Sequence, residues 1–86
     1  MECWIGVSTE GDRRVIRVAG RLAVAHVPEF LIACEGKGPL ELNLSDLASA
    51  DNAGVEALQR MRRKGATLVG TPGYILLKID AAAQRI

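Results

Sequence analysis

The chain has few of the side chains on which metal and redox chemistry depend. Its 86 residues include one histidine, His26, and two cysteines, Cys3 and Cys34, which are far apart and lack a Cys-x-x-Cys spacing. A zinc site needs closely spaced nitrogen or sulfur ligands, so we expect neither a metal nor a cofactor. Two buried free thiols in a cytosolic protein are favoured over a disulfide, because disulfides are rare in reducing compartments.

Aromatic residues and net charge are also scarce. Trp4, Phe30 and Tyr74 are the only aromatic residues, and 11 basic residues face 10 acidic ones. Single-stranded nucleic acid is bound by stacking on aromatic faces, and phosphate backbones attract basic surfaces. We therefore expect no nucleic-acid partner. The basic run at 60–64 falls where a helix is expected to end, and cations there complement the helix dipole.

Long apolar runs are missing as well. No stretch approaches the roughly 18 apolar residues that a membrane span requires, so we expect no direct membrane insertion. The N-terminal residues include Glu2 and do not form the apolar core of a signal peptide. These features predict a cytoplasmic location.

Groups arranged for catalysis are not recognisable. His26 has no carboxylate or nucleophile placed with it in the sequence, and the segment 70–73, Gly-Thr-Pro-Gly, lacks the pattern of a phosphate-binding loop. We expect no catalytic residues and no enzymatic activity.

Aliphatic residues, in contrast, are abundant, and they suffice for the core of a single domain spanning 1–86. Segments 3–8 and 13–20 have strand patterns, and Gly11-Asp12 between them predicts a tight antiparallel hairpin. The rest alternates between helix and strand. We expect a first helix through Pro28, which ends at Gly36 and Gly38, and then a strand at 40–47. A second helix at 51–64 should bury Ala57, Leu58 and Met61, and a strand at 66–70 should follow it. The last helix is expected to have Thr71 as its N-cap and Pro72 at its first position.

The predicted fold is therefore α/β, in the order β-β-α-β-α-β-α. A four-stranded mixed sheet begins with the hairpin and continues with parallel strands, because strands joined by a helical crossover are usually parallel. Three helices cover this sheet.

One corner of this fold, at residues 51–54, combines a capping acid with a glycine. Asp51 precedes a helix whose first backbone N–H groups need partners, so its carboxylate is suited to cap them. Gly54, in the first turn, costs about 1 kcal/mol of helix propensity relative to alanine. That cost suggests that something packs closely against the turn, either a neighbouring loop of the chain or a partner protein.

Longer stretches of the sequence resemble a known family. The segments VIRVAGRL, LELNLSDLASADNAGVEAL and GATLVG, in this order, are similar to a STAS domain, the fold of anti-sigma factor antagonists and of small subunits of lipid-transport ABC systems. The resemblance covers about residues 13 to 80. Its most specific part is the strand followed by Asp-x-x-Gly and a helix, matched here by Asp51 and Gly54.

The resemblance implies that the corner is a docking site. In the antagonists it commonly reads Asp-Ser-Ser-Gly or Asp-Ser-Thr-Gly, and a kinase that is also the anti-sigma factor phosphorylates a hydroxyl there. Here Asn52 and Ala53 replace the hydroxyl residues, so the usual phosphorylation is excluded. Asn52 occupies the position of a threonine in the lipid-transport subunits. A displaced phosphorylation site at the nearby Ser49 is the alternative that stays open.

We thus expect a protein-interaction module of the anti-sigma antagonist type, bound to an anti-sigma factor or serine kinase. The alternative is the STAS subunit of a lipid-transport ABC complex, bound to its ATPase, and a homodimer is a third. The predicted partner-binding residues are Asp51, Asn52, Ala53, Gly54, Val55 and Glu56, together with the loop at 20–24.

Overall fold

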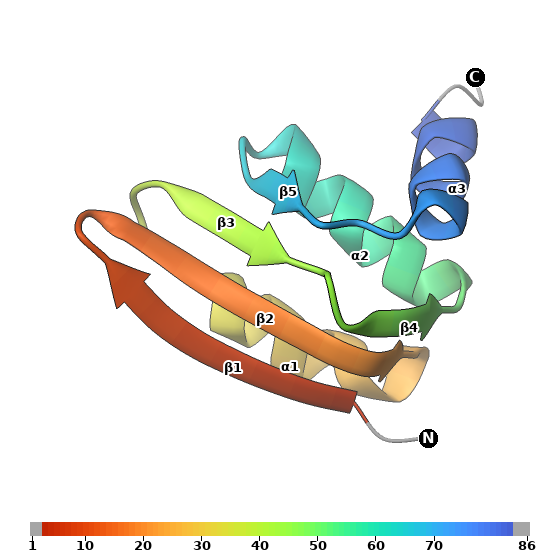
Figure 1. The fold of residues 1–86 in the computed structure, drawn as a ribbon, viewed down its shortest axis with the longest axis horizontal. Coiled ribbons are helices and arrows are strands. Elements are labelled where there is room, and N and C mark those ends of the chain that lie inside the picture. The colour runs from red at the N-terminus through yellow and green to blue at the C-terminus, as the bar shows by residue number, and fades with distance from the viewer. Residues whose placement is uncertain (1–2, 84–86) are drawn as a thin grey trace.

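The computed structural model describes residues 3–83, which form one five-stranded mixed sheet and three α-helices (Figure 1). In chain order the elements are β1 (Cys3–Glu10), β2 (Arg13–Leu22), the short 3-10 helix η1 (Val24–His26), α1 (Val27–Cys34), β3 (Leu40–Asn43), β4 (Leu47–Ala50), α2 (Asn52–Arg63), β5 (Thr67–Val69) and α3 (Gly73–Ala83). The predicted fold class is confirmed, with one strand more than expected.

The N-terminal hairpin forms as predicted. β1 pairs antiparallel with β2, and the last pair of the ladder, Glu10 and Arg13, leaves Gly11 and Asp12 as a two-residue turn. Gly11 has a φ of 62°, which the tight turn requires and which glycine adopts without a steric penalty. β1 thereby becomes one edge of the sheet, and β5 forms the other.

The extra strand arises because the segment 40–47 does not run straight. β3 and β4 are both parallel to β2 and pair with successive parts of it. Between them the Oδ1 atom of Asn43 accepts a hydrogen bond from the N–H of Ser45 at 3.1 Å, and the carbonyl of Leu44 accepts one from Leu47 at 3.1 Å. These local bonds turn the chain, whereas the Leu-x-Leu-x-Leu alternation predicts a single continuous strand.

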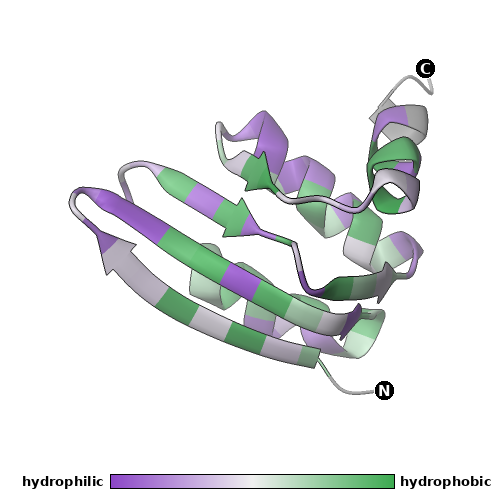
Figure 2. Ribbon diagram, viewed as in Figure 1, coloured by the Kyte–Doolittle hydropathy of each residue, from purple (hydrophilic) through white to green (hydrophobic). Residues whose placement is uncertain are grey.

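The core lies between the sheet and the helices on one of its faces. α1 and α2 lie behind the sheet in Figure 1, and α3 stands beside α2. Ile16, Val18 and Leu42 from the strands meet Phe30 of α1 and Leu58 of α2, and all five are at most 1% exposed. Within residues 3–83 no helix covers the opposite face. Figure 2 shows β2 as short apolar stretches separated by hydrophilic residues.

α2 buries the face that its spacing predicts. Ala57, Leu58 and Met61 are each at most 5% exposed, at positions i, i+1 and i+4 of the helix. The helix ends at Arg63, and Gly65 follows with a φ of 102°. α2 is thus held against the sheet along its length, which fixes the position of its first turn.

α3 begins one residue later than predicted. Its first residue is Gly73, and the carbonyl of Pro72 accepts the first helical hydrogen bond, from the N–H of Leu76 at 2.9 Å. The hydroxyl of Thr71 is buried and has no hydrogen-bond partner among the described residues, so Thr71 does not cap the helix. Pro72 therefore occupies the capping position that the sequence assigns to Thr71.

Two polar contacts fasten α3 to α2. The Nε2 atom of the buried Gln59 donates a hydrogen bond to the carbonyl of Ile79 at 2.6 Å, and Arg62 forms a salt bridge with Asp80 at 3.0 Å. Ile75 and Ile79 are fully buried in the same interface. The C-terminal helix is accordingly part of the core up to at least Asp80.

Candidate docking site

Asp51 is the centre of the corner between β4 and α2. Its Oδ1 atom accepts a hydrogen bond from the N–H of Gly54 at 2.8 Å, which caps the helix, and its Oδ2 atom accepts one from the N–H of Val24 at 2.9 Å. The second bond joins residues 27 positions apart in the sequence. Both carboxylate oxygens are therefore used within the protein, to hold η1 against the first turn of α2.

This environment favours the charged form of Asp51. The N–H of Gly54, then that of Val24, and more weakly the nearby Arg21 lower the pKa of the carboxyl group below its ordinary value, against a smaller opposing effect of desolvation. A carboxylate that accepts backbone hydrogen bonds binds a proton less readily. Asp51 is thus ionised at neutral pH and interacts favourably with the positive end of the helix dipole.

Gly54 is required by the protein's own packing. A Cβ atom at this position would lie 2.3 Å from the carbonyl oxygen of Leu22, the last residue of β2. That same oxygen accepts a hydrogen bond from the N–H of Asp51 at 3.1 Å. Of the two origins that the sequence leaves open for the close approach, a neighbouring segment of the chain is the one observed.

The six predicted docking residues differ in their exposure to solvent. Asn52 and Glu56 are exposed, Ala53 is half-buried, and Asp51 is half-buried with its oxygens bonded. Gly54 is buried, and the side chain of Val55 is only 6% exposed and belongs to the core. Gly54 and Val55 thus pack within the protein, because their positions in the first helical turn face the sheet, and a contact of either with a partner stays a prediction.

The loop at 20–24, which is predicted to belong to the docking surface, also contains both buried and exposed side chains. Leu22 is fully buried, whereas the side chain of Val24 is 66% exposed although its backbone is held by Asp51. In the same loop Arg21 is exposed and Ala23 is half-buried. Val24, Asn52, Ala53 and Glu56 are four members of the prediction with exposed or half-buried side chains, in η1 and at the start of α2. We refer to these four residues as the corner surface. No sequence signal indicates the bond between Asp51 and Val24, because it depends on the tertiary fold.

Glu56 leaves its charge on this surface. The spacing of Glu56 and Arg60 predicts an ion pair on the outside of α2, yet the salt bridges found within residues 3–83 are Arg13–Glu41 and Arg62–Asp80. The carboxylate of Glu56 is exposed and has no ion-pair partner there.

Ser49 and His26 lie close to the corner in the sequence but have other settings. Ser49 is half-buried in β4, where it pairs with Arg21 of β2. His26 is half-buried at the end of η1, and its Nδ1 atom has no hydrogen-bond partner among the described residues. Whether Ser49 is phosphorylated stays a prediction.

The described residues contain neither a candidate metal centre nor a candidate membrane span. From Cys3 to Ala83, no three side chains of histidine, cysteine, aspartate or glutamate lie close enough together to hold a metal ion. No helix in that range is sufficiently long and apolar to cross a membrane. Both cysteines are free thiols, with Cys34 buried and Cys3 half-buried.

Comparisons with known proteins agree with this architecture. No family model and no curated protein matches the chain. Among solved structures, the chain is similar to an antisigma-factor antagonist, a STAS domain from Rhodobacter sphaeroides, with 28% identity and a TM-score of 0.58 over 80% of this chain and 85% of that one. It is also similar in fold to a protein called Mglu, at 22% identity and a TM-score of 0.57 over 79% of this chain but only 19% of the Mglu chain.

Proposed function

Since the chain is a STAS domain by its fold, we propose that it is a regulatory interaction module of the anti-sigma antagonist type, which docks a protein partner through the corner surface. The likeness to the bacterial antagonist supports this proposal, because it spans 80% of this chain and 85% of that one. We propose binding, and not catalysis, as its activity.

The proposal rests on one observation: the corner surface has exposed side chains on a backbone that hydrogen bonds hold in place. The side chain of Val24 is 66% exposed, although its backbone is fixed by Asp51. An apolar side chain that is exposed on a rigid support loses little conformational entropy when a partner covers it. The amide of Asn52 is exposed beside the helix N-terminus and can donate or accept hydrogen bonds.

The same residues suggest that docking is constitutive. A phosphoryl group at this helix N-terminus would add nearly two negative charges, but Asn52 and Ala53 have no hydroxyl to receive one. We infer that the chain stays in a state that resembles the unphosphorylated antagonist. Phosphorylation of Ser49 would restore a switch, although Ser49 is half-buried in β4 and is therefore less accessible than the exposed Asn52.

The proposed partner is an anti-sigma factor with serine-kinase activity, in the cytoplasm. The ATPase of a lipid-transport ABC complex is the alternative partner, because the corner has the same Asp-x-Ala-Gly form. A pull-down of the tagged protein from its native host, followed by mass spectrometry, distinguishes them. Recovery of a transporter ATPase or permease would replace the regulatory proposal by the transport one.

A charge substitution tests whether the corner surface is the interface. We expect Asn52→Asp to weaken the binding of the recovered partner by at least 1–2 kcal/mol, about tenfold, because an unpaired charge must be desolvated on docking. Isothermal titration calorimetry measures the change. Fold stability is not at risk, since a carboxylate at the start of α2 interacts favourably with the helix dipole. Ala53→Glu should act in the same direction.

Lys37→Gln is the matched control. It also lowers the net charge by one, but Lys37 lies in the exposed loop before β3, after the C-terminal end of α1. We expect its affinity for the partner to equal that of the natural sequence. Unchanged affinity of Asn52→Asp, or an equal loss in Lys37→Gln, would remove the corner from the interface. A phosphate on Ser49 after incubation with the partner kinase, detected by peptide mapping, would contradict constitutive docking.

A further inference from the structure

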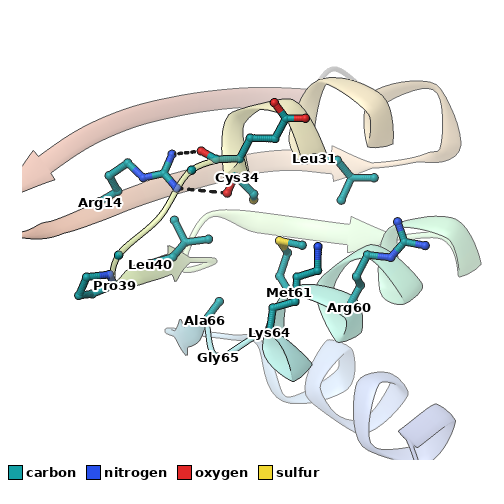
Figure 3. Close-up of a pocket in the computed structure, with 13 residues that line it drawn as sticks. Arg14, Leu31, Cys34, Pro39, Leu40, Arg60, Met61, Lys64, Gly65 and Ala66 are labelled. Atoms are coloured by element: carbon teal, nitrogen blue, oxygen red, sulfur yellow. Dashed lines mark hydrogen bonds between the residues drawn. The ribbon is translucent and has the colours of Figure 1, made fainter.

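A cavity of about 530 Å³ lies at the far end of α2 from the corner surface, between the C-terminal ends of α1 and α2 and the start of β3 (Figure 3). Its apolar lining includes Leu31, Leu40, Met61 and Ala66, and the Cys34 side chain also lines it. Sites for small molecules in proteins have volumes of about 300–1,000 Å³. The cavity is thus large enough for a small organic ligand.

The charges around this cavity are mostly positive. Arg14, Arg60 and Lys64 contribute three cations to the lining, and Glu35 contributes one carboxylate. Arg60 and Lys64 are exposed, and neither forms a salt bridge within residues 3–83. Their exposed charges, attached to the same helical segment as Met61, suit an anion whose remaining part is apolar.

The carbonyl oxygens at the two helix ends do not cancel this charge. Arg14 donates hydrogen bonds to the carbonyls of Ala33, Cys34 and Glu35, at 3.3, 3.2 and 2.6 Å, and so covers the negative end of α1. At α2, the last carbonyls accept hydrogen bonds from the backbone N–H groups of residues 64–66. Arg14 is therefore occupied within the protein, whereas the charges of Arg60 and Lys64 remain available to a ligand.

We propose that this cavity binds a small organic anion with an apolar body, with its acidic group at Arg60 and Lys64 and its apolar part against Leu31 and Met61. Both sites include residues of α2, but they share none: the last corner residue on the helix, Glu56, lies one helical turn, about 6 Å along the axis, before Arg60. The proposal is independent of protein docking.

Calorimetry with octanoate and acetate tests the two requirements of the ligand. We expect octanoate to bind at least about tenfold more tightly than acetate, because only octanoate has an apolar body to bury. The Arg60→Ala/Lys64→Ala double variant should lose about tenfold or more in octanoate affinity, since charge-assisted hydrogen bonds are the stronger class. Arg63→Ala is the matched control, because Arg63 is an exposed cation of the same helix that does not line the cavity.

Cys34 provides a second measurement in the unmodified chain. Octanoate in the cavity should slow the alkylation of Cys34 by iodoacetamide, read by peptide mapping, and should leave Cys3 unaffected. Absence of octanoate binding at millimolar concentration, equal affinities for octanoate and acetate, or an equal loss in the Arg63→Ala control would each overturn the proposal. Asn52→Asp should leave octanoate affinity unchanged, so failure of the docking proposal does not affect this test.

Discussion

Replacement of Gly54 by alanine tests the packing of the corner most directly. The new Cβ atom would lie 2.3 Å from the carbonyl oxygen of Leu22, about 1 Å closer than an ordinary carbon–oxygen contact. Neither side can yield easily, because Leu22 accepts a hydrogen bond from Asp51, and Asp51 in turn holds the N–H groups of Gly54 and Val24.

The expected loss follows from two opposing effects. Overpacking costs about 1–3 kcal/mol, and a clash with backbone falls at the upper end of that range. Alanine recovers about 1 kcal/mol of helix propensity, which leaves a net loss of about 2 kcal/mol in the free energy of unfolding. For a domain of this size the melting temperature should fall by about 8–16 °C. Thermal and urea unfolding followed by circular dichroism measure both quantities.

Gly73→Ala is the matched control for this experiment. Gly73 is also in the first turn of a helix, but no other segment of the described chain comes within 4 Å of the position that a Cβ atom would take there. We expect unchanged or slightly increased stability, because the gain in helix propensity meets no clash. If Gly54→Ala is as stable as the natural sequence, or if Gly73→Ala is destabilised equally, the close packing of β2 on α2 is not what requires glycine.

Two further predictions concern titratable groups. Asp51 has a lowered pKa in the folded protein, so its contribution to stability is present above the pKa of the unfolded chain and is lost as the pH falls through the folded value. Asp51→Asn should therefore lose less stability than the natural sequence between pH 7 and pH 3, measured by urea unfolding at both, and an identical loss would contradict this role. Burial raises the pKa of the Cys34 thiol to about 11, against the smaller opposing effects of Arg14 and Lys64. Its thiolate is then about a hundredfold scarcer at pH 8 than that of an ordinary cysteine, and alkylation by iodoacetamide should be slower by about that factor than in the urea-unfolded chain. Equal rates would show that the thiol is not buried.

Much of the fold could be predicted from local patterns. The Gly11-Asp12 turn, the buried stripe of α2 and the β-β-α start of the domain depend on neighbours within a few residues, which the sequence displays directly. The break between β3 and β4 could not be predicted in this way. The leucine alternation continues through it, and the interruption comes from a side chain of Asn43 that bonds to the backbone of Ser45.

The candidate site shows the same division. The motif at 51–54 is identifiable from Asp51 and Gly54, and the role of Asp51 as a helix cap follows from its position before the helix. The burial of Val55 could not be predicted, because the helix register relative to the sheet decides which side of the first turn is covered. Arg60 and Lys64 are exposed at the end of α2, as expected for the basic run at 60–64, and they also line a cavity that the sequence does not indicate.

The sequence by itself determined the order of the elements apart from the division of the strand at 40–47 into β3 and β4. It also determined the capped start of α2 and the lack of a phosphorylatable hydroxyl at Asn52 and Ala53, because each depends on residue identity and local spacing. Only the tertiary structure decided what the corner does with these residues. Asp51 reaches Val24, and Gly54 admits the end of β2, through contacts between segments that lie about 30 residues apart in the chain. Such contacts depend on how the helix packs on the sheet, and no local pattern specifies that packing.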